Sequence, residues 1–313
     1  MKRVVLFTSS LLLFIFNALK KENKGPVGGQ AVIEGVMMRS RNRWSVAVRG
    51  TDREIHLKTE PLKRTFWFFR LPLIRGTVAL IQSLVLGIKA IEFSAAWALE
   101  EEDEKIGSFG MLTTVVFSMV LGIAMFVFLP LYLTKLLEAL FPLLSESSVF
   151  FNLTDGLFRV AIFLFYLFVV GLWSEMRRIF EYHGAEHKAI HAYERGDQLE
   201  PDLIIEKYSP AHPRCGTSFL LIVMIVSILI FSLIPNNWSV LFKFLSRIIL
   251  IPVVAGVSYE LLKLTAKYKR QPLVKAIAWP GLALQRLTTR EPTVDQLEVA
   301  IIALKEAVSD GNV

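Results

Sequence analysis

The sequence contains a single cysteine, Cys215, among 313 residues. One cysteine excludes a disulfide within the chain, so the fold does not depend on a disulfide framework. In a reducing compartment this thiol is either a metal ligand or an inert side chain.

Charged residues are absent from two long stretches. Residues 111–134 carry no charge over 24 positions, and residues 216–242 carry none over 27. Both stretches exceed the length that a helix needs to cross a bilayer. Two further apolar segments, 157–174 and 244–264, have charged residues only near their ends. With 53% hydrophobic residues and a mean hydropathy of +0.49, the sequence predicts an α-helical polytopic membrane protein with four transmembrane helices, interfacial amphipathic helices and a small cytoplasmic β-meander.

Basic residues are missing from the connections 136–155 and 235–241, whereas the connection 175–214 holds six. Because lysine and arginine stay on the cytoplasmic side, this asymmetry places the central loop and both termini in the cytoplasm. The net charge of +7 is spread along segments next to the spans, which favours a lipid bilayer as partner and argues against nucleic acid. A homo-oligomer or a second membrane protein remains open as a further partner.

The N-terminal apolar segment lacks a small-residue cleavage pattern, so we interpret it as an interfacial segment rather than a signal peptide. The expected organisation has five regions. They are an apolar interfacial segment (1–24), a cytoplasmic β-rich region (25–65), an amphipathic interfacial helix (66–105), a transmembrane domain with a cytoplasmic loop at 175–215 (106–268), and a cytoplasmic helical tail (269–313).

Three short strands are expected in the β-rich region, at 31–38, 44–49 and 54–59. Glu34 falls within the first of them. A carboxylate in an otherwise apolar strand favours a paired structural group over a catalyst, and Glu34 is kept as a secondary candidate.

A helical pattern covers residues 66–99, with Arg75, Gln82 and Lys89 recurring every seven residues. A spanning helix would place these polar groups in hydrocarbon. We therefore expect a helix on the cytoplasmic membrane surface, or a re-entrant pair.

Four of the five histidines lie within 33 residues of one another, in the same stretch as the cysteine. If residues 175–194 form a helix that continues the second span, His183 and His187 project from one face, where they can bind one metal ion. Glu186 is close enough to exchange a proton with water at that ion. His-x-x-Glu-His is the inverted order of the zinc-protease helix. The alternative is a polar interfacial helix without metal.

The remaining ligands stay open at this stage. Glu260, at the cytoplasmic end of the last span, resembles the downstream glutamate that completes inverzincin sites, and this set would leave a position for water. The alternative reading is an ion pair of Glu260 with Lys263 or with Arg177. His212 and Cys215 would instead give a closed, structural set, and His191 is a further candidate. Zinc is the expected ion, with manganese or iron as alternatives.

The C-terminal tail contains an amphipathic helix at 294–308, with Thr293 as its expected N-cap. Before it, Pro280-Gly281 and Arg290-Glu291-Pro292 are expected to bracket short helical pieces.

Four segments stand out together: residues 28–39 (GGQAVIEGVMMR), 183–188 (HGAEHK), 212–219 (HPRCGTSF), and 280–282 through 291–292. They resemble the YqhQ-like family of bacterial membrane proteins, which carries the label of predicted metal-dependent enzyme. The resemblance implies a bacterial cytoplasmic (inner) membrane location and supports metal binding, but it supplies no substrate.

Two functions compete on this sequence. The first is a membrane-embedded metal-dependent hydrolase with Glu186 as general base and His183, His187 and Glu260 as ligands. The second is a non-catalytic membrane scaffold with at most a structural metal. Transport is a weaker third, since the spans hold few polar residues.

Overall fold

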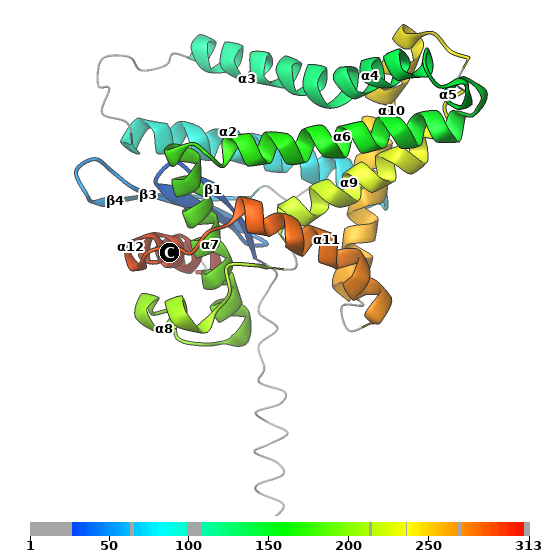
Figure 1. Cartoon of the computed structure of the whole chain (residues 1–313). Coiled ribbons are helices and arrows are strands. Elements are labelled where there is room, and N and C mark those ends of the chain that lie inside the picture. The colour runs from blue at the N-terminus through cyan, green and yellow to red at the C-terminus, as the bar shows by residue number, and fades with distance from the viewer. Residues whose placement is uncertain are drawn as a thin grey trace, which may run out of the picture.

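The computed structural model describes residues 27–62, 66–98, 108–212, 215–235, 237–267 and 271–309 (Figure 1). The predicted interfacial segment at residues 1–24 lies outside the described residues.

An antiparallel sheet of four strands in the order β1-β2-β3-β4 forms the β-rich region. The strands are β1 (Gly28–Val32), β2 (Gly35–Arg39), β3 (Arg43–Arg49) and β4 (Ile55–Pro61). The predicted first strand is therefore wrong, because a tight turn splits it into two. Glu34 lies in that turn with a φ of 51°, rather than within a strand.

The sheet packs between helices on both faces, with α2 on one side and α7 and α12 on the other (Figure 1). Because strand side chains alternate between faces, Met37 and Val46 contact the layer of α2, which contributes Leu86. Val36 and Ala47 point the other way, into the core shared with α7 and α12. Both faces of the meander are thus buried.

In the part of the chain that the structure describes, four helical segments are long and apolar enough to cross a membrane, judged by length and composition: Ile74–Ala98, Leu112–Glu138, Ser148–Val170 and Val240–Leu264. They include α2 (Ile74–Ala98), which the sequence pattern assigned to the membrane surface. The span expected within residues 216–242 is not among them, because the helix found there, α9 (Gly216–Phe231), is shorter than that expectation requires. It ends before the expected connection 235–241, and α10 (Val240–Lys267) follows.

The helix that carries the histidines is separate from the preceding apolar helix. α6 (Ser148–Val170) ends at a turn around Gly171, and α7 (Ser174–Arg195) begins after Trp173, which has extended backbone angles. The expectation of one continuous helix is therefore wrong, although the predicted helix 175–194 itself is confirmed. Gly196 ends α7 in the left-handed conformation, with a φ of 79°.

Two helices close the chain, α11 (Pro272–Thr288) and α12 (Val294–Val308). α11 is one helix that continues through Pro280, so the short helical pieces expected on either side of this proline are wrong. Thr293 caps α12 as predicted, in a capping box with Gln296. The remaining elements are η1 (Trp67–Arg70), α3 (Ser108–Ile123), η2 (Ala124–Phe128), α4 (Leu129–Glu138), α5 (Pro142–Glu146) and α8 (Pro201–Lys207).

Candidate metal centre

α7 places His183 and His187 one turn apart on the same face, with their ring centroids 4.4 Å from each other. Cys215 lies directly before α9 and brings its thiol to these two rings. The three potential ligand atoms lie within 4.8 Å of one another, and Nε2 of His183 is 3.1 Å from Sγ of Cys215. Among the described residues, this is the group of histidine, cysteine and acidic side chains that can hold a metal ion.

Hydrogen bonds to backbone carbonyls determine the tautomer of both histidines. Nδ1 of His183 donates to the carbonyl of Thr288 at 2.7 Å, and Nδ1 of His187 donates to the carbonyl of Pro210 at 2.5 Å. Since a carbonyl only accepts, both protons sit on Nδ1 and both Nε2 atoms of the neutral rings carry lone pairs. Metal-binding histidines commonly have this second-shell arrangement.

Nε2 of His187 is buried and has no hydrogen-bond partner among the described residues. The whole side chain is only 1% exposed. This burial lowers the pKa of His187, because the charged imidazolium loses its hydration, although the nearby Cys215 thiol opposes the shift. His187 is therefore held as a neutral base next to a thiol.

Gly184 allows the chain after α11 to approach α7. A Cβ atom at this position would lie 1.9 Å from the carbonyl oxygen of Arg290, so only glycine fits. The amide of Arg290 donates to the carbonyl of Phe180, which fixes the segment along the helix. This close approach holds the carbonyl of Thr288 beside His183.

Glu186 lies beside the cluster and is 4% exposed. The Gly29 amide of β1 donates to its carboxylate, and a Cβ at Gly29 would come within 2.9 Å of the carboxylate carbon. The other carboxylate oxygen, Oε2, has no hydrogen-bond partner among the described residues. Burial raises the pKa of Glu186 to about 8, although nearby His183 opposes this shift.

His191 and His212 form a neighbouring pair rather than further members of the group. Their ring centroids are 4.5 Å apart, and Nε2 of His191 donates to the carbonyl of Ala211. Nε2 of His212 lies 3.8 Å from a carboxylate oxygen of Glu194. This pair continues the buried polar layer along α7 without entering the three-ligand group.

A model of a protein family of unknown function, DUF1385, matches residues 71–310. The chain belongs to the DUF1385 family. It is 33% identical over 298 residues to the uncharacterized protein YqhQ of Bacillus subtilis (strain 168). The alignment covers 89% of this chain and 91% of that relative. The family resemblance seen in the sequence is thus confirmed. No solved structure matches the chain.

Glu260, the third ligand expected from the sequence, is engaged elsewhere in this DUF1385 chain. Nε of Arg75 donates to its Oε1 at 2.6 Å, and Nη2 of Arg75 donates to its Oε2. This forked ion pair joins α10 to α2. Glu260 is thus in an ion pair, as the alternative reading had it, but its partner is Arg75 rather than Lys263 or Arg177, and the acid is not part of the group around His183.

Glu34 is also a paired carboxylate. Both of its oxygens accept hydrogen bonds from the guanidinium of Arg178, and the Tyr182 hydroxyl donates to Oε2 at 3.2 Å. These contacts tie the β1–β2 turn to α7, which agrees with the structural role expected for Glu34.

Sequence reasoning missed the residues that orient the ligands of the DUF1385 site. The carbonyls of Pro210 and Thr288 come from distant segments, and backbone groups leave no sequence signal. Gly29 and Gly184, in contrast, did leave a sequence signal. Gly29 follows another glycine, and Gly184 lies inside the histidine motif. A glycine within a helix costs stability, so it indicates a close approach.

Proposed function

We propose that this DUF1385 protein is an integral membrane protein that binds a divalent metal ion, zinc by its donor set, through His183, His187 and Cys215. The observation that carries the proposal is the hydrogen bonding of both Nδ1 atoms, which leaves two Nε2 lone pairs next to a thiol. Cys215 takes the place that we had expected for Glu260.

The donor set fits zinc in chemistry and in spacing. Zinc binds imidazole nitrogen at about 2.0 Å and thiolate sulfur at about 2.3 Å, which separates tetrahedral ligands by roughly 3.5 Å. The Nε2–Sγ distance of 3.1 Å and the overall spread of 4.8 Å lie on either side of that value. The partnerless Nε2 of His187 supports the same conclusion, since a buried acceptor without a partner is costly.

We further propose that the metal centre serves hydrolysis. A bound zinc ion would supply Lewis acidity, and three protein ligands leave a fourth position open, as in catalytic zinc sites. Glu186 is positioned to hold or move a proton through its partnerless Oε2, while the Gly29 amide keeps the carboxylate in place. The substrate class remains to be found by screening esters, phosphoesters and peptides.

One observation favours a structural metal in a non-catalytic scaffold as the second candidate. The cluster joins three separate segments. The histidines of α7 contact the Pro210 carbonyl and the Cys215 thiol on one side, and the Thr288 carbonyl on the other. His187 and Cys215 are both buried. A metal at this junction would hold α9, α11 and α7 together even without catalysis.

Metal analysis of the detergent-purified full-length protein tests the shared part of both candidates. We expect about one metal ion per chain in the wild type and almost none in His183→Ala/His187→Ala. His56→Ala is the matched control, because His56 lies on β4 against Asp52, outside the cluster. A wild type without metal after purification in added zinc would contradict both candidates.

Glu186→Gln separates the two candidates. The hydrolase predicts an intact metal content and a loss of turnover on whichever substrate the wild type cleaves. The scaffold predicts no turnover in either protein, together with a stable partner that co-purifies with both.

The proposed setting is the bacterial cytoplasmic membrane, with the metal centre on its cytoplasmic side. The four apolar helices support a bilayer environment, and the basic residues of loop 175–214 support a cytoplasmic position for α7. We expect activity from a reporter that works only in the cytoplasm when it is fused after Val308. Activity of a periplasmic reporter at this position would overturn the orientation.

A further inference from the structure

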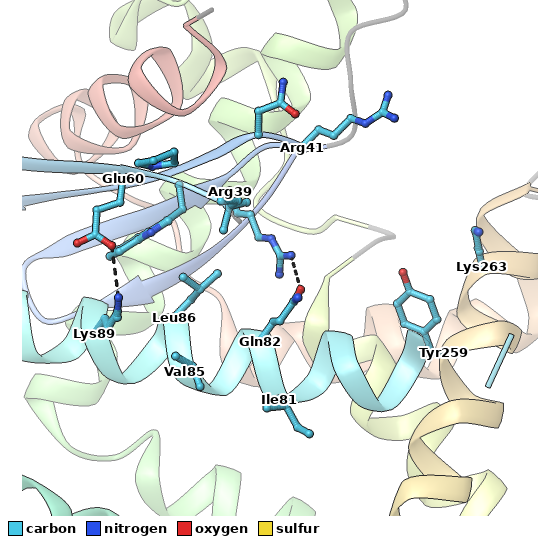
Figure 2. Close-up of a pocket in the computed structure, with 14 residues that line it drawn as sticks. Arg39, Arg41, Glu60, Ile81, Gln82, Val85, Leu86, Lys89, Tyr259 and Lys263 are labelled. Atoms are coloured by element: carbon cyan, nitrogen blue, oxygen red, sulfur yellow. Dashed lines mark hydrogen bonds and ion pairs between the residues drawn. The ribbon is translucent and has the colours of Figure 1, made fainter. Parts of the chain in front are cut away.

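A large groove lies between α2, α10 and the end of the sheet that carries the β2–β3 turn, with a volume of about 1400 Å³ (Figure 2). The strands β2 to β4 form one wall, and α2 forms the floor. Tyr259 and Lys263 of α10 close one end. The groove is larger than the volume of roughly 300–1,000 Å³ that holds a drug-sized ligand.

The polar wall of the groove carries an excess of positive charge. Its basic residues are Arg39, Arg41, Lys89 and Lys263, against one acid, Glu60. Glu60 is already paired, since Nζ of Lys89 lies 3.4 Å from Oε2 and Nζ of Lys58 lies 3.2 Å from Oε1. The other three basic residues, Arg39, Arg41 and Lys263, therefore line the groove without an ion pair to Glu60.

Arg39 is the deepest of these groups. Its Nη2 donates to the amide oxygen of Gln82 at 2.9 Å, and no described carboxylate forms an ion pair with it. Burial lowers the pKa of Arg39, because the guanidinium has lost part of its hydration. A neutral amide does not compensate that charge, so an anion gains from binding here.

Apolar side chains of α2 lie next to this basic wall. Ile81 is 55% exposed and Val85 is 49% exposed, and both line the groove beside the buried Leu86 (Figure 2). α2 is also one of the helices apolar enough to enter a bilayer. A soluble phosphate would gain nothing from these side chains, whereas an acyl chain would bury them.

We propose that this groove binds an anionic phospholipid, with the headgroup phosphate on Arg39, Arg41 and Lys263 and an acyl chain along Ile81 and Val85. Guanidinium groups suit this ligand because they bind phosphate oxygens through paired hydrogen bonds. The site is separate from the metal centre and depends on the proposed membrane setting only.

Native mass spectrometry of the detergent-purified full-length protein tests this site with phosphatidylglycerol and phosphatidylcholine. The wild type should retain phosphatidylglycerol preferentially. Arg39→Gln/Lys263→Gln should weaken that binding about thirtyfold, since two basic groups near an anionic lipid are lost. Arg53→Gln/Lys305→Gln removes the same charge from exposed positions outside the groove and should bind as the wild type does.

A second pair of variants tests the apolar wall. Ile81→Asn/Val85→Asn should also weaken binding of phosphatidylglycerol, whereas Val116→Asn/Val120→Asn, at exposed positions of α3, should not. Glycerol phosphate at equal concentration should fail to displace the lipid from the wild type. Displacement would show a site for soluble phosphate and would overturn the proposal.

Equal retention of the two lipids by the wild type would overturn the proposal as well, and this comparison needs no variant to fold. Arg39→Gln/Lys263→Gln should keep the metal content of the wild type. Loss of lipid preference with metal retained therefore concerns the groove alone, and loss of metal alone concerns the metal centre.

Discussion

The cluster on α7 and the charged network between α6, α9 and α10 are both buried, but they differ in what they leave unpaired. In the cluster, donor atoms of His183, His187 and Cys215 converge around one point, and Nε2 of His187 has no hydrogen bond among the described residues. In the network, Asp155 pairs with both Arg159 and Arg247, and the atom without a hydrogen-bond partner among the described residues is a donor, Nε of Arg247. The first arrangement suits an added ligand, whereas the second suits the joining of helices.

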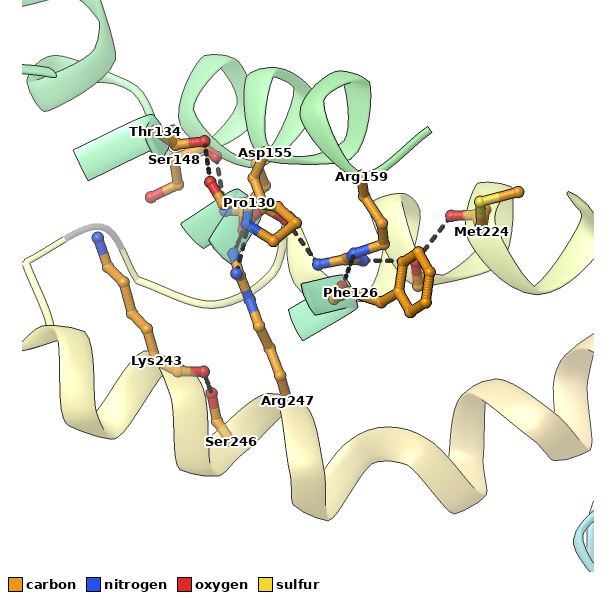
Figure 3. Close-up of polar contacts among 12 residues, drawn as sticks. Phe126, Pro130, Thr134, Ser148, Asp155, Arg159, Met224, Lys243, Ser246 and Arg247 are labelled. Carbon is orange, nitrogen blue, oxygen red and sulfur yellow. Dashed lines mark hydrogen bonds and ion pairs between the residues drawn. The ribbon is translucent and has the colours of Figure 1, made fainter. Parts of the chain in front are cut away.

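Asp155 is the centre of the network (Figure 3). One carboxylate oxygen accepts from Nη2 of Arg159 at 2.8 Å, and the other accepts from Nη1 of Arg247 at 2.7 Å. Arg159 also donates to Ser227 of α9 and to the carbonyl of Phe126 in η2. These contacts join four helical elements through one carboxylate.

Buried polar groups can be assigned by this difference. A fully buried carboxylate shared by two guanidinium groups is compensated, so this acid needs no cation from outside. The unpaired atom of the cluster is an acceptor, because Nε2 of His187 has no donor among the described residues, and it lies next to a thiol that can also bind a cation. Substitutions in each region test this contrast.

Asp155→Asn should give the largest loss of stability. It leaves two buried guanidinium groups without their counter-charge, which costs about 3–5 kcal/mol. We expect a strong fall in the unfolding temperature in detergent, or loss of the monodisperse peak in size-exclusion chromatography. Glu206→Gln, at an exposed position of α8, removes the same charge and should leave both measurements unchanged. Wild-type stability of Asp155→Asn would refute the structural role of the network.

Metal removal should destabilise the protein through the cluster on α7. A ligand present at 100 times its dissociation constant stabilises the folded state by about 2.7 kcal/mol. A chelator should therefore lower the unfolding temperature of the zinc-loaded wild type and of Asp197→Asn, whose carboxylate lies outside the cluster, paired with Lys207. Cys215→Ser should respond much less. An equal response from Cys215→Ser would exclude the thiol as a ligand.

Gly184→Ala should disturb the cluster without removing a ligand. The added methyl group would meet the carbonyl oxygen of Arg290 at 1.9 Å, and overpacking of this kind costs about 1–3 kcal/mol. We expect a lower unfolding temperature and a reduced metal content, because the Thr288 carbonyl moves away from His183. Gly28→Ala is the control, since a Cβ there meets nothing within 4 Å. An unchanged metal content would show that Thr288 does not orient His183.

Local signals predicted the helix that carries the site. The polar run around the histidines and the cap at Thr293 are encoded within a few residues, and both are confirmed. The sheet was predicted in outline only. The turn at Glu34 was missed because β-forming residues flank it, and the left-handed residue is Glu34 rather than Gly35, which follows it.

Long-range contacts account for the other errors. The pairing of Glu260 with Arg75 joins residues 185 positions apart, and no periodicity reports it. The sequence placed a connection at 235–241, but hydropathy did not show that α9 already ends at Phe231. Similarly, the predicted topology placed Cys215 at the same membrane face as His183, but the sequence did not decide between Cys215 and Glu260 as the third ligand.

Ser227→Ala should give the smallest effect, and it tests how the network tolerates damage away from its charges. Nη1 of Arg159 loses an acceptor at 2.8 Å, while its bonds to Asp155 and Phe126 remain. The net cost of one hydrogen bond is about 1 kcal/mol. Ser232→Ala is the matched control, because its exposed hydroxyl donates only to the carbonyl of Leu229. A loss as large as that of Asp155→Asn, measured by thermal unfolding in the same detergent, would mean that the hydroxyl joining α6 to α9 matters as much as the carboxylate joining α6 to α10.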